Sequence, residues 1–104
     1  MIELNDNTWN DFISKNERVL VDVYGDGCGP CNALVPVFRE AESINLDRVA
    51  FAKINGMINV ECLALFGIRA VPTLMYFKSG KLIHRETGFR NLDEIQDGIN
   101  KYLL

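Results

Sequence analysis

The sequence lacks the features that mark membrane-spanning and nucleic-acid-binding proteins. No apolar stretch approaches the roughly 20 residues that a transmembrane helix needs. The 11 Lys and Arg residues are fewer than the 14 Asp and Glu residues, the net charge is −3, and no basic run occurs. Because nucleic-acid binders carry a clustered basic surface, we expect neither nucleic acid nor a membrane as a partner. The N-terminus also lacks the charged and apolar regions of a secretory signal, so the expected location is the cytoplasm.

Cysteine and histidine are scarce, with three Cys and one His in the chain. Cys28 and Cys31 have the C-x-x-C spacing, which in a reducing cytosol is more often catalytic or metal-binding than a permanent bridge. A zinc site would have to add Cys62 and His84, and neither has the usual second-half spacing. Zinc binding and an inert pair therefore remain the weaker alternatives. Cys62 lies among apolar residues and is predicted to pack in the core, whereas His84 is predicted to lie on the surface.

The apolar pattern predicts one α/β domain spanning residues 1–104. With 104 residues, of which 48% are hydrophobic, the chain is long enough to bury a core without disulfide staples. Helical spacing predicts helices over residues 8–14, 28–45, 59–66 and from 91 onward. Apolar runs predict strands over residues 19–24, 49–54, 73–77 and 82–87, the last two forming a hairpin. This order indicates a mixed central sheet with helices on both faces.

Capping residues mark the ends of two of these helices. Asn59 is the predicted N-cap of the 59–66 helix, and Gly67 is its predicted C-terminal stop. Asn91 is followed three residues later by Glu94, which is a variant of the capping box. The last helix is therefore predicted to begin at Asn91.

The cysteine pair lies where a buried strand gives way to a helix. Cys28 is placed at the helix N-terminus, where unpaired N–H groups and the helix dipole favour negative charge. The thiolate is the form that attacks a disulfide, so Cys28 is the predicted nucleophile. Cys31 lies three residues later on the same helix face and is predicted to resolve the mixed disulfide formed with a target. Pro30 suits the first helical turn because it has no N–H to leave unpaired.

Motifs along nearly the whole chain resemble those of the thioredoxin family. They are Val21-Asp22-Val23-Tyr24, Cys28-Gly29-Pro30-Cys31, the run from Gly67 to Leu74 containing Val71-Pro72-Thr73, Phe77-Lys78-Ser79-Gly80, and Gly88. C-G-P-C together with a downstream V-P-T at this interval is far more specific than either motif alone. The resemblance implies the thioredoxin fold, an α/β fold with a mixed five-stranded sheet in strand order 1-3-2-4-5, four flanking helices and a closing antiparallel hairpin.

The resemblance also implies roles for individual residues. Asp22 matches a buried carboxylate that takes the proton of Cys31, and Lys53 matches the usual partner of that acid. The residue pattern marks Asp22 as well, because an acid in an apolar strand is unfavourable unless paired and burial raises its pKa; it is either a general base or a satisfied structural acid. Pro72 matches a cis-proline that packs against the cysteines. The implied substrate-docking surface comprises Gly27, Gly29, Pro30, Val71, Thr87 and Gly88.

The function that the resemblance implies is reduction of protein disulfides by dithiol–disulfide exchange, the chain acting as an electron carrier. The implied partners are disulfide-containing proteins and a thioredoxin reductase, either flavin-linked or ferredoxin-linked. We expect no cofactor and no metal ion in the chain itself, and we expect a monomer. Three alternatives stay open: a specialised electron donor to one reductase, an oxidant or isomerase of the same fold, and a non-catalytic binding module.

Four positions depart from the family pattern. Gly27 stands where most members have Trp before the first cysteine, and Tyr24 stands where Trp is also usual. Asn32 replaces a common Lys, and Met57 replaces a usual Asp. The missing indole is expected to alter target choice and recognition by the reductase. The missing Lys charge is expected to disfavour the thiolate by less than about 1 kcal/mol.

Overall fold

The computed structural model describes residues 1–104 and has a mixed five-stranded sheet in the order β1-β3-β2-β4-β5. The strands are β1 (Ile2–Leu4), β2 (Arg18–Tyr24), β3 (Ala50–Asn55), β4 (Thr73–Lys78) and β5 (Lys81–Thr87). The helices are α1 (Trp9–Lys15), α2 (Gly29–Ile44), α3 (Val60–Phe66), α4 (Leu92–Gly98) and a final π-helical turn, η1 (Ile99–Leu103). β3 runs parallel to β1 and β2, whereas β4 pairs antiparallel with β2 and β5. The sheet order and the closing hairpin confirm the predicted fold.

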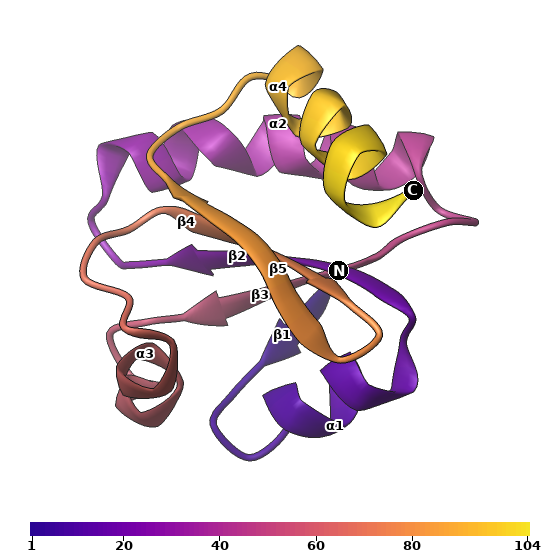
Figure 1. Ribbon diagram of the computed structural model, residues 1–104. Coiled ribbons are helices and arrows are strands. Elements are labelled where there is room, and N and C mark those ends of the chain that lie inside the picture. The colour runs from indigo at the N-terminus through magenta and orange to yellow at the C-terminus, as the bar shows by residue number, and fades with distance from the viewer.

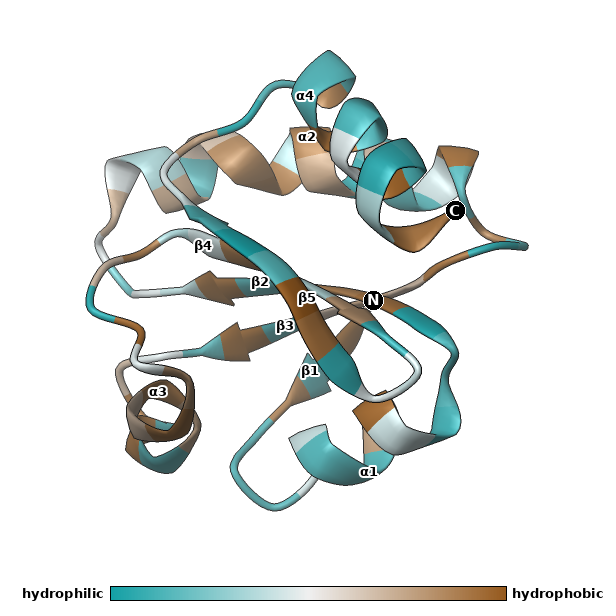
Figure 2. Cartoon of the chain, viewed as in Figure 1, coloured by the Kyte–Doolittle hydropathy of each residue, from teal (hydrophilic) through white to brown (hydrophobic).

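Helices cover both faces of the sheet (Figure 1). On one face, Leu20 and Tyr76 of the strands pack with Phe38 of α2 and Ile95 of α4. On the other face, α1 and α3 cover a second cluster of buried apolar residues. Figure 2 shows hydrophobic and hydrophilic segments alternating along α2, as expected for a helix with one buried side. No helix combines the length and the apolar character needed to cross a membrane.

The predicted strands and the first three predicted helices agree with the structure to within one residue at each end, and the last helix begins at Leu92, one residue after Asn91. The capping box is confirmed, because Asn91 Oδ1 accepts from the Glu94 N–H at 2.9 Å and Glu94 Oε1 accepts from the Asn91 N–H at 3.0 Å. Gly67 ends α3 with a left-handed φ of 65°, which glycine adopts without steric penalty. The apolar pattern does not mark the three-residue β1, which only the family resemblance implied.

The N-terminus of α3 is capped from a distant part of the chain. Asn59 occupies the N-cap position, as predicted, but its side chain makes no capping hydrogen bond. Its amide instead donates to the Asn55 carbonyl at 2.8 Å. The Asp6 carboxylate takes the capping role, accepting from the Cys62 N–H at 2.9 Å and from the Glu61 N–H at 3.4 Å. The segment after β1 is thereby fastened to α3.

Gly98 of α4 lies against the buried ring of Tyr76 and leaves no room for a side chain. A Cβ at Gly98 would lie 2.4 Å from Tyr76 Oη and 2.8 Å from Tyr76 Cζ. The ring is fully buried, and its hydroxyl donates to Glu86 at 3.1 Å. We expect Gly98→Ala to lower the free energy of unfolding by about 1–3 kcal/mol, as overpacking does. Urea denaturation measures this, and Gly29→Ala, whose Cβ would meet nothing within 4 Å, is the control; equal midpoints for the two variants would contradict the prediction.

Candidate active site

The loop between β2 and α2 brings the cysteine pair to one end of the sheet. β2 ends at Tyr24, and a short turn follows before α2 begins at Gly29. Gly25 is buried against the loop before β4, because a Cβ there would lie 3.1 Å from Val71 Cγ2. Gly27 has a φ of 66°, in the left-handed region that favours glycine. This tight turn places Cys28 at the N-cap of α2.

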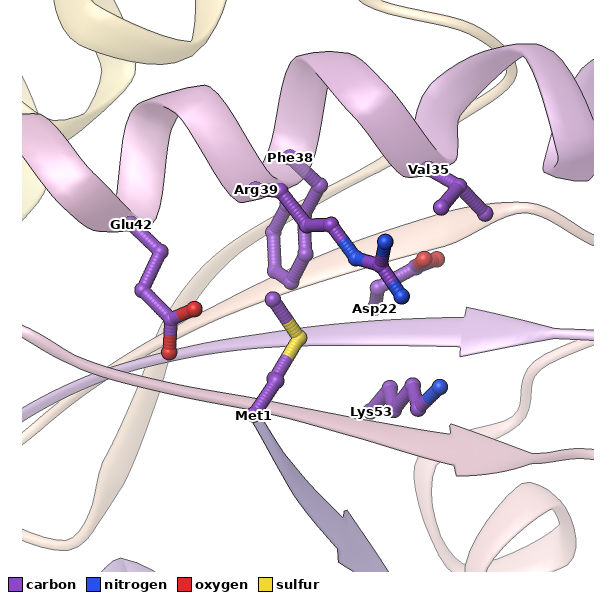
Figure 3. Close-up of a pocket in the computed structure, with 7 residues that line it drawn as sticks. All are labelled: Met1, Asp22, Val35, Phe38, Arg39, Glu42 and Lys53. Atoms are coloured by element: carbon purple, nitrogen blue, oxygen red, sulfur yellow. The ribbon is translucent and has the colours of Figure 1, made fainter.

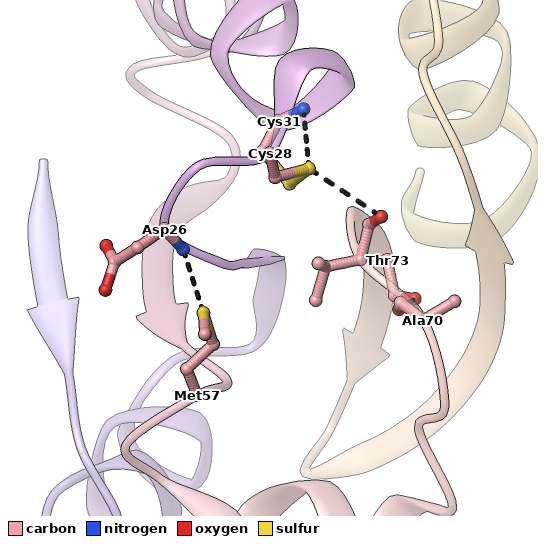
Figure 4. Close-up of a disulfide and its surroundings, with 7 residues drawn as sticks. Asp26, Cys28, Cys31, Met57, Ala70 and Thr73 are labelled. Atoms are coloured by element: carbon pink, nitrogen blue, oxygen red, sulfur yellow. Dashed lines mark hydrogen bonds between the residues drawn. A yellow bond between two sulfur atoms is a disulfide. The ribbon is translucent and has the colours of Figure 1, made fainter.

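Cys28 and Cys31 form a disulfide, with their Cα atoms 5.2 Å apart. The Cys31 N–H donates to Cys28 Sγ at 3.2 Å, so this sulfur is the acceptor of the helix cap (Figure 4). Cys28 is half-buried, whereas Cys31 is only 2% exposed. The N–H groups and the dipole of the 16-residue α2 favour negative charge on the capping sulfur. The more accessible sulfur is therefore the one whose thiolate form the helix stabilises.

The loop before β4 lies against the cysteines. The Val71–Pro72 peptide bond is cis, as the family resemblance implied. The Val71 carbonyl oxygen lies 3.8 Å from Cys28 Sγ, and the Gly88 N–H donates to the Pro72 carbonyl at 2.8 Å. The loop before β4 therefore reaches the accessible sulfur, and the residue that follows β5 is joined to that loop. Of the predicted docking residues, Gly27, Gly29, Pro30 and Thr87 are exposed, and Val71 and Gly88 are half-buried.

Asp22 is a buried acid without a full set of partners. Asp22 is only 4% exposed, and its Oδ1 makes no hydrogen bond. Burial raises the pKa of Asp22 from 3.8 to about 7; the positive charge of Lys53 acts in the opposite direction, and the negative charge of Glu3 adds to the increase. A buried charge without partners is unfavourable, so Asp22 can both hold and release a proton near neutral pH.

Two cavities meet at Asp22. The smaller, of about 110 Å³, is lined by Asp22, Tyr24, Cys31, Asn32, Val35 and Lys53. The larger, of about 360 Å³, shares Asp22, Val35 and Lys53 and adds Met1, Phe38, Arg39 and Glu42. Figure 3 shows residues of α2 and residues of the strands enclosing this larger cavity. Asp22 therefore shares one space with Cys31 and a second, larger space with the exposed residue Arg39.

Lys53 lies beside Asp22 but pairs with a different acid. The two residues are opposite one another in the β2–β3 register, yet Lys53 Nζ forms its ion pair with Glu3, at 3.8 Å. The Tyr24 hydroxyl donates to Glu3 as well, with both carboxylate oxygens at 2.9 Å. Burial, followed by the hydrogen bond and charge of Glu3, raises the pKa of Tyr24 to about 12. Sequence reasoning missed Glu3, whose only signal was an acid between two apolar residues near the N-terminus.

The residues that a zinc site would need are not brought together. No group of three or more His, Cys, Asp or Glu side chains is arranged to hold a metal ion. Cys62 is 1% exposed in the core, as predicted, and burial, with the nearby charge of Asp6, raises its pKa to about 11. His84, expected on the surface, is half-buried because its ring stacks on Tyr102 with centroids 4.1 Å apart.

Comparison with known proteins identifies the family of the chain. The family model described as Thioredoxin matches residues 1–101. Thioredoxin from Alicyclobacillus acidocaldarius subsp. acidocaldarius is 33% identical over 93 residues, which is 89% of either chain. Thioredoxin C-3 of Corynebacterium nephridii is 33% identical over 103 residues, covering 98% of this chain and 70% of that protein. The crystal structure of Chlamydomonas reinhardtii thioredoxin f2 matches with a TM-score of 0.89 and 26% identity, covering 97% of this chain and 94% of the other.

The chain belongs to the thioredoxin family. As a thioredoxin-family member with a disulfide-forming cysteine pair, it is a thiol-disulfide oxidoreductase with protein-disulfide reductase activity. Its substrates are disulfide-containing proteins, and a reductase returns its cysteine pair to the dithiol form.

The structure shows the local consequences of two departures from the thioredoxin pattern. The left-handed φ of Gly27 would strain the Trp that is usual there, as it would any L side chain. Met57 replaces the usual Asp and takes a polar role of its own, because its thioether sulfur accepts from the Asp26 N–H at 3.1 Å (Figure 4). Sequence reasoning noted the replacement at Met57 but missed this contact. The loop before Cys28 is thus held by a thioether at a position where the family pattern usually has an acid.

Proposed function

We propose that Cys28 is the nucleophile, Cys31 the resolving thiol and Asp22 the base that takes the proton of Cys31. The observation that carries this assignment is the contrast between the two sulfurs. Cys28 is half-buried at the N-cap of α2 and its Sγ accepts an N–H bond, whereas Cys31 is buried and lines the same cavity as Asp22. One sulfur is therefore placed to meet a target, and the other to exchange a proton inside the protein.

The reaction proceeds in two displacement steps. The Cys28 thiolate attacks one sulfur of the target disulfide, an intermolecular S–S bond forms, and the second target sulfur leaves as a thiolate. Cys31 then gives its proton to the Asp22 carboxylate and attacks Cys28 Sγ, which releases the first target sulfur as a thiolate. Two electrons pass from the cysteine pair to the target, and the target thiolates take up protons.

The remaining predicted residues support these steps. Lys53 sits opposite Asp22 in the sheet, and its charge limits the rise in the pKa of that acid. Pro72, in the cis form, sets the loop whose Val71 carbonyl faces Cys28 Sγ. An extended target segment would pair with this backbone as an added strand. The small residues around it, Gly27, Gly29, Pro30, Thr87 and Gly88, leave the surface open to the target.

The physiological setting follows from the chemistry of a dithiol reductant. We place the chain in the cytoplasm, because a reductant must act where its own disulfide is returned to the dithiol. We also propose that it acts as a monomer. A flavin-linked or ferredoxin-linked reductase would supply the electrons. Because most thioredoxins carry Trp at the position of Gly27, the reductase that accepts this chain must dock without an indole contact.

Insulin reduction together with a reduction potential tests the proposed direction of electron flow. The wild-type protein should accelerate the reduction of insulin by dithiothreitol, followed as turbidity of the released chains. The potential of the cysteine pair should lie in the range of cytosolic dithiol proteins, about −200 to −270 mV. A value near about −120 mV, typical of a strong disulfide oxidant, would contradict the reductant role and favour an oxidant or isomerase.

A further inference from the structure

A groove beside the cysteine pair carries two arginines and no acidic side chain. Its volume is about 520 Å³, and it runs between β5 and the loop before β4, with Arg69, Arg85, Thr73 and Thr87 among its lining residues. We call it the arginine groove. None of the four salt bridges of the chain includes Arg69 or Arg85. Two cations therefore face solvent without an internal counter-ion, in a chain whose net charge is −3.

The arginine groove is continuous with the proposed docking surface. Thr73 directly follows Pro72, and Thr87 directly precedes Gly88. The hydroxyl oxygens of these two threonines lie 3.2 Å apart, so they join the two sides of the groove where it meets the docking surface. A target segment that lies across the docking surface therefore passes the mouth of the groove.

The guanidinium of Arg85 is held in place with most of its donors free. Its Nη1 donates to the Phe66 carbonyl at the C-terminal end of α3, and Arg85 is exposed. A guanidinium has five N–H donors in a rigid fork, so one bond to a carbonyl leaves the others for a ligand. A fixed fork of this kind recognises carboxylates by paired, charge-assisted hydrogen bonds.

We propose that the arginine groove binds Asp or Glu side chains of the target protein and that the chain therefore prefers targets with acidic residues near their disulfide. The proposal rests on the proposed function, because the target disulfide has to be docked at Cys28. Charge complementarity identifies the partner, since an unpaired arginine pair beside a reaction site favours an anionic segment and disfavours a cationic one.

Two disulfide-linked peptides that differ only in charge test the preference. One has two Glu residues on either side of its cysteine, and the other has Gln in the same places. At low ionic strength we expect the wild-type protein to reduce the Glu peptide with a kcat/KM about tenfold higher, and we expect the ratio to approach one in about 0.5 M salt. The variant Arg69→Gln/Arg85→Gln should reduce both peptides with the kcat/KM that the wild-type protein has for the Gln peptide.

A lysine variant with the same net charge as the arginine variant distinguishes the effect of the groove from the effect of the overall charge of the protein. Lys81→Gln/Lys101→Gln removes two exposed cations that do not line the groove, and it should keep the preference for the Glu peptide. The proposal is overturned if the arginine variant keeps the preference, if the lysine variant loses it equally, or if the wild-type protein shows none.

A binding measurement separates the groove from the exchange chemistry. If the wild-type protein reduced neither peptide, the proposed function would fail and kinetics could not report on the groove. Calorimetry of a linear Glu peptide with the Cys28→Ser/Cys31→Ser variant avoids this, because no thiol is involved. Binding should weaken about tenfold when Arg69 and Arg85 are also replaced by Gln; unchanged binding would overturn the groove while leaving the exchange mechanism intact.

Discussion

Replacing Cys31 with serine is expected to arrest the protein as a covalent adduct with its target. Cys28 keeps its place at the N-cap of α2 and attacks as before, but no sulfur is left to release the target. Serine has nearly the same size as cysteine, so the 2% exposed site should accept it without repacking. Electrophoresis under non-reducing conditions should show a mixed disulfide with the target, and dithiothreitol should reduce it. Insulin reduction by the variant should fall to the background rate.

Cys28→Ser is the matched control for this trap. It removes the accessible sulfur and retains the buried one, so it should abolish turnover and form no adduct. An adduct with Cys28→Ser equal to that with Cys31→Ser would show that the roles of the two sulfurs are wrongly assigned. No adduct with either variant, under conditions in which the wild-type protein turns over, would refute the two-step scheme.

The elements that carry the cysteines were predictable because their signals are local. Residues 19–23 are all buried in β2, and a near-continuous apolar run is the signal of a strand covered on both faces. The apolar spacing from Leu34 onward then predicted a helix after the glycine-rich turn, and the C-x-x-C motif fell on its first turn. Asp22 was conspicuous for the same reason, as the one acid within that run.

The residues that escaped prediction act across large sequence separations. Asp6 caps α3, and Glu3 contacts both Tyr24 and Lys53. Glu3 lies in a strand of only three residues, and Asp6 follows that strand closely. Three residues are too few to show a period, and no local pattern tells which distant donor an acid will meet. The arginine groove is similar, because its two sides come together only once β5 has paired with β4.

Replacing Asp22 with asparagine is expected to slow the resolving step about a hundredfold at pH 8, the lower end of what a general base contributes. With a pKa of about 7, the wild-type carboxylate is ionised above that pH and accepts the proton of Cys31. The rate of release of the mixed disulfide should therefore rise through pH 7 in the wild-type protein, and the variant should lack this rise. Stopped-flow kinetics between pH 5 and 9 measure it.

The first step provides the control for this assignment. In the Cys31→Ser background, only the attack by Cys28 is observed, and Asp22→Asn should leave its rate nearly unchanged. An equal loss in both backgrounds would mean that Asp22 acts on Cys28 and not on the buried sulfur.

The same substitution is expected to make the fold more stable, and the pH dependence of that gain identifies its cause. The pKa of Asp22 is about 7 in the folded protein against 3.8 ordinarily, so between these values the unfolded chain loses a proton that the folded one retains. Each pH unit in this window lowers the wild-type free energy of unfolding by about 1.4 kcal/mol. The free energies of unfolding of the wild-type protein and the variant should therefore be equal near pH 4 and differ by up to about 4 kcal/mol at pH 7. Above pH 7 the difference should stay constant. A satisfied structural acid would behave oppositely, since its loss would lower stability at neutral pH, and a difference independent of pH would exclude ionisation of Asp22 as the cause.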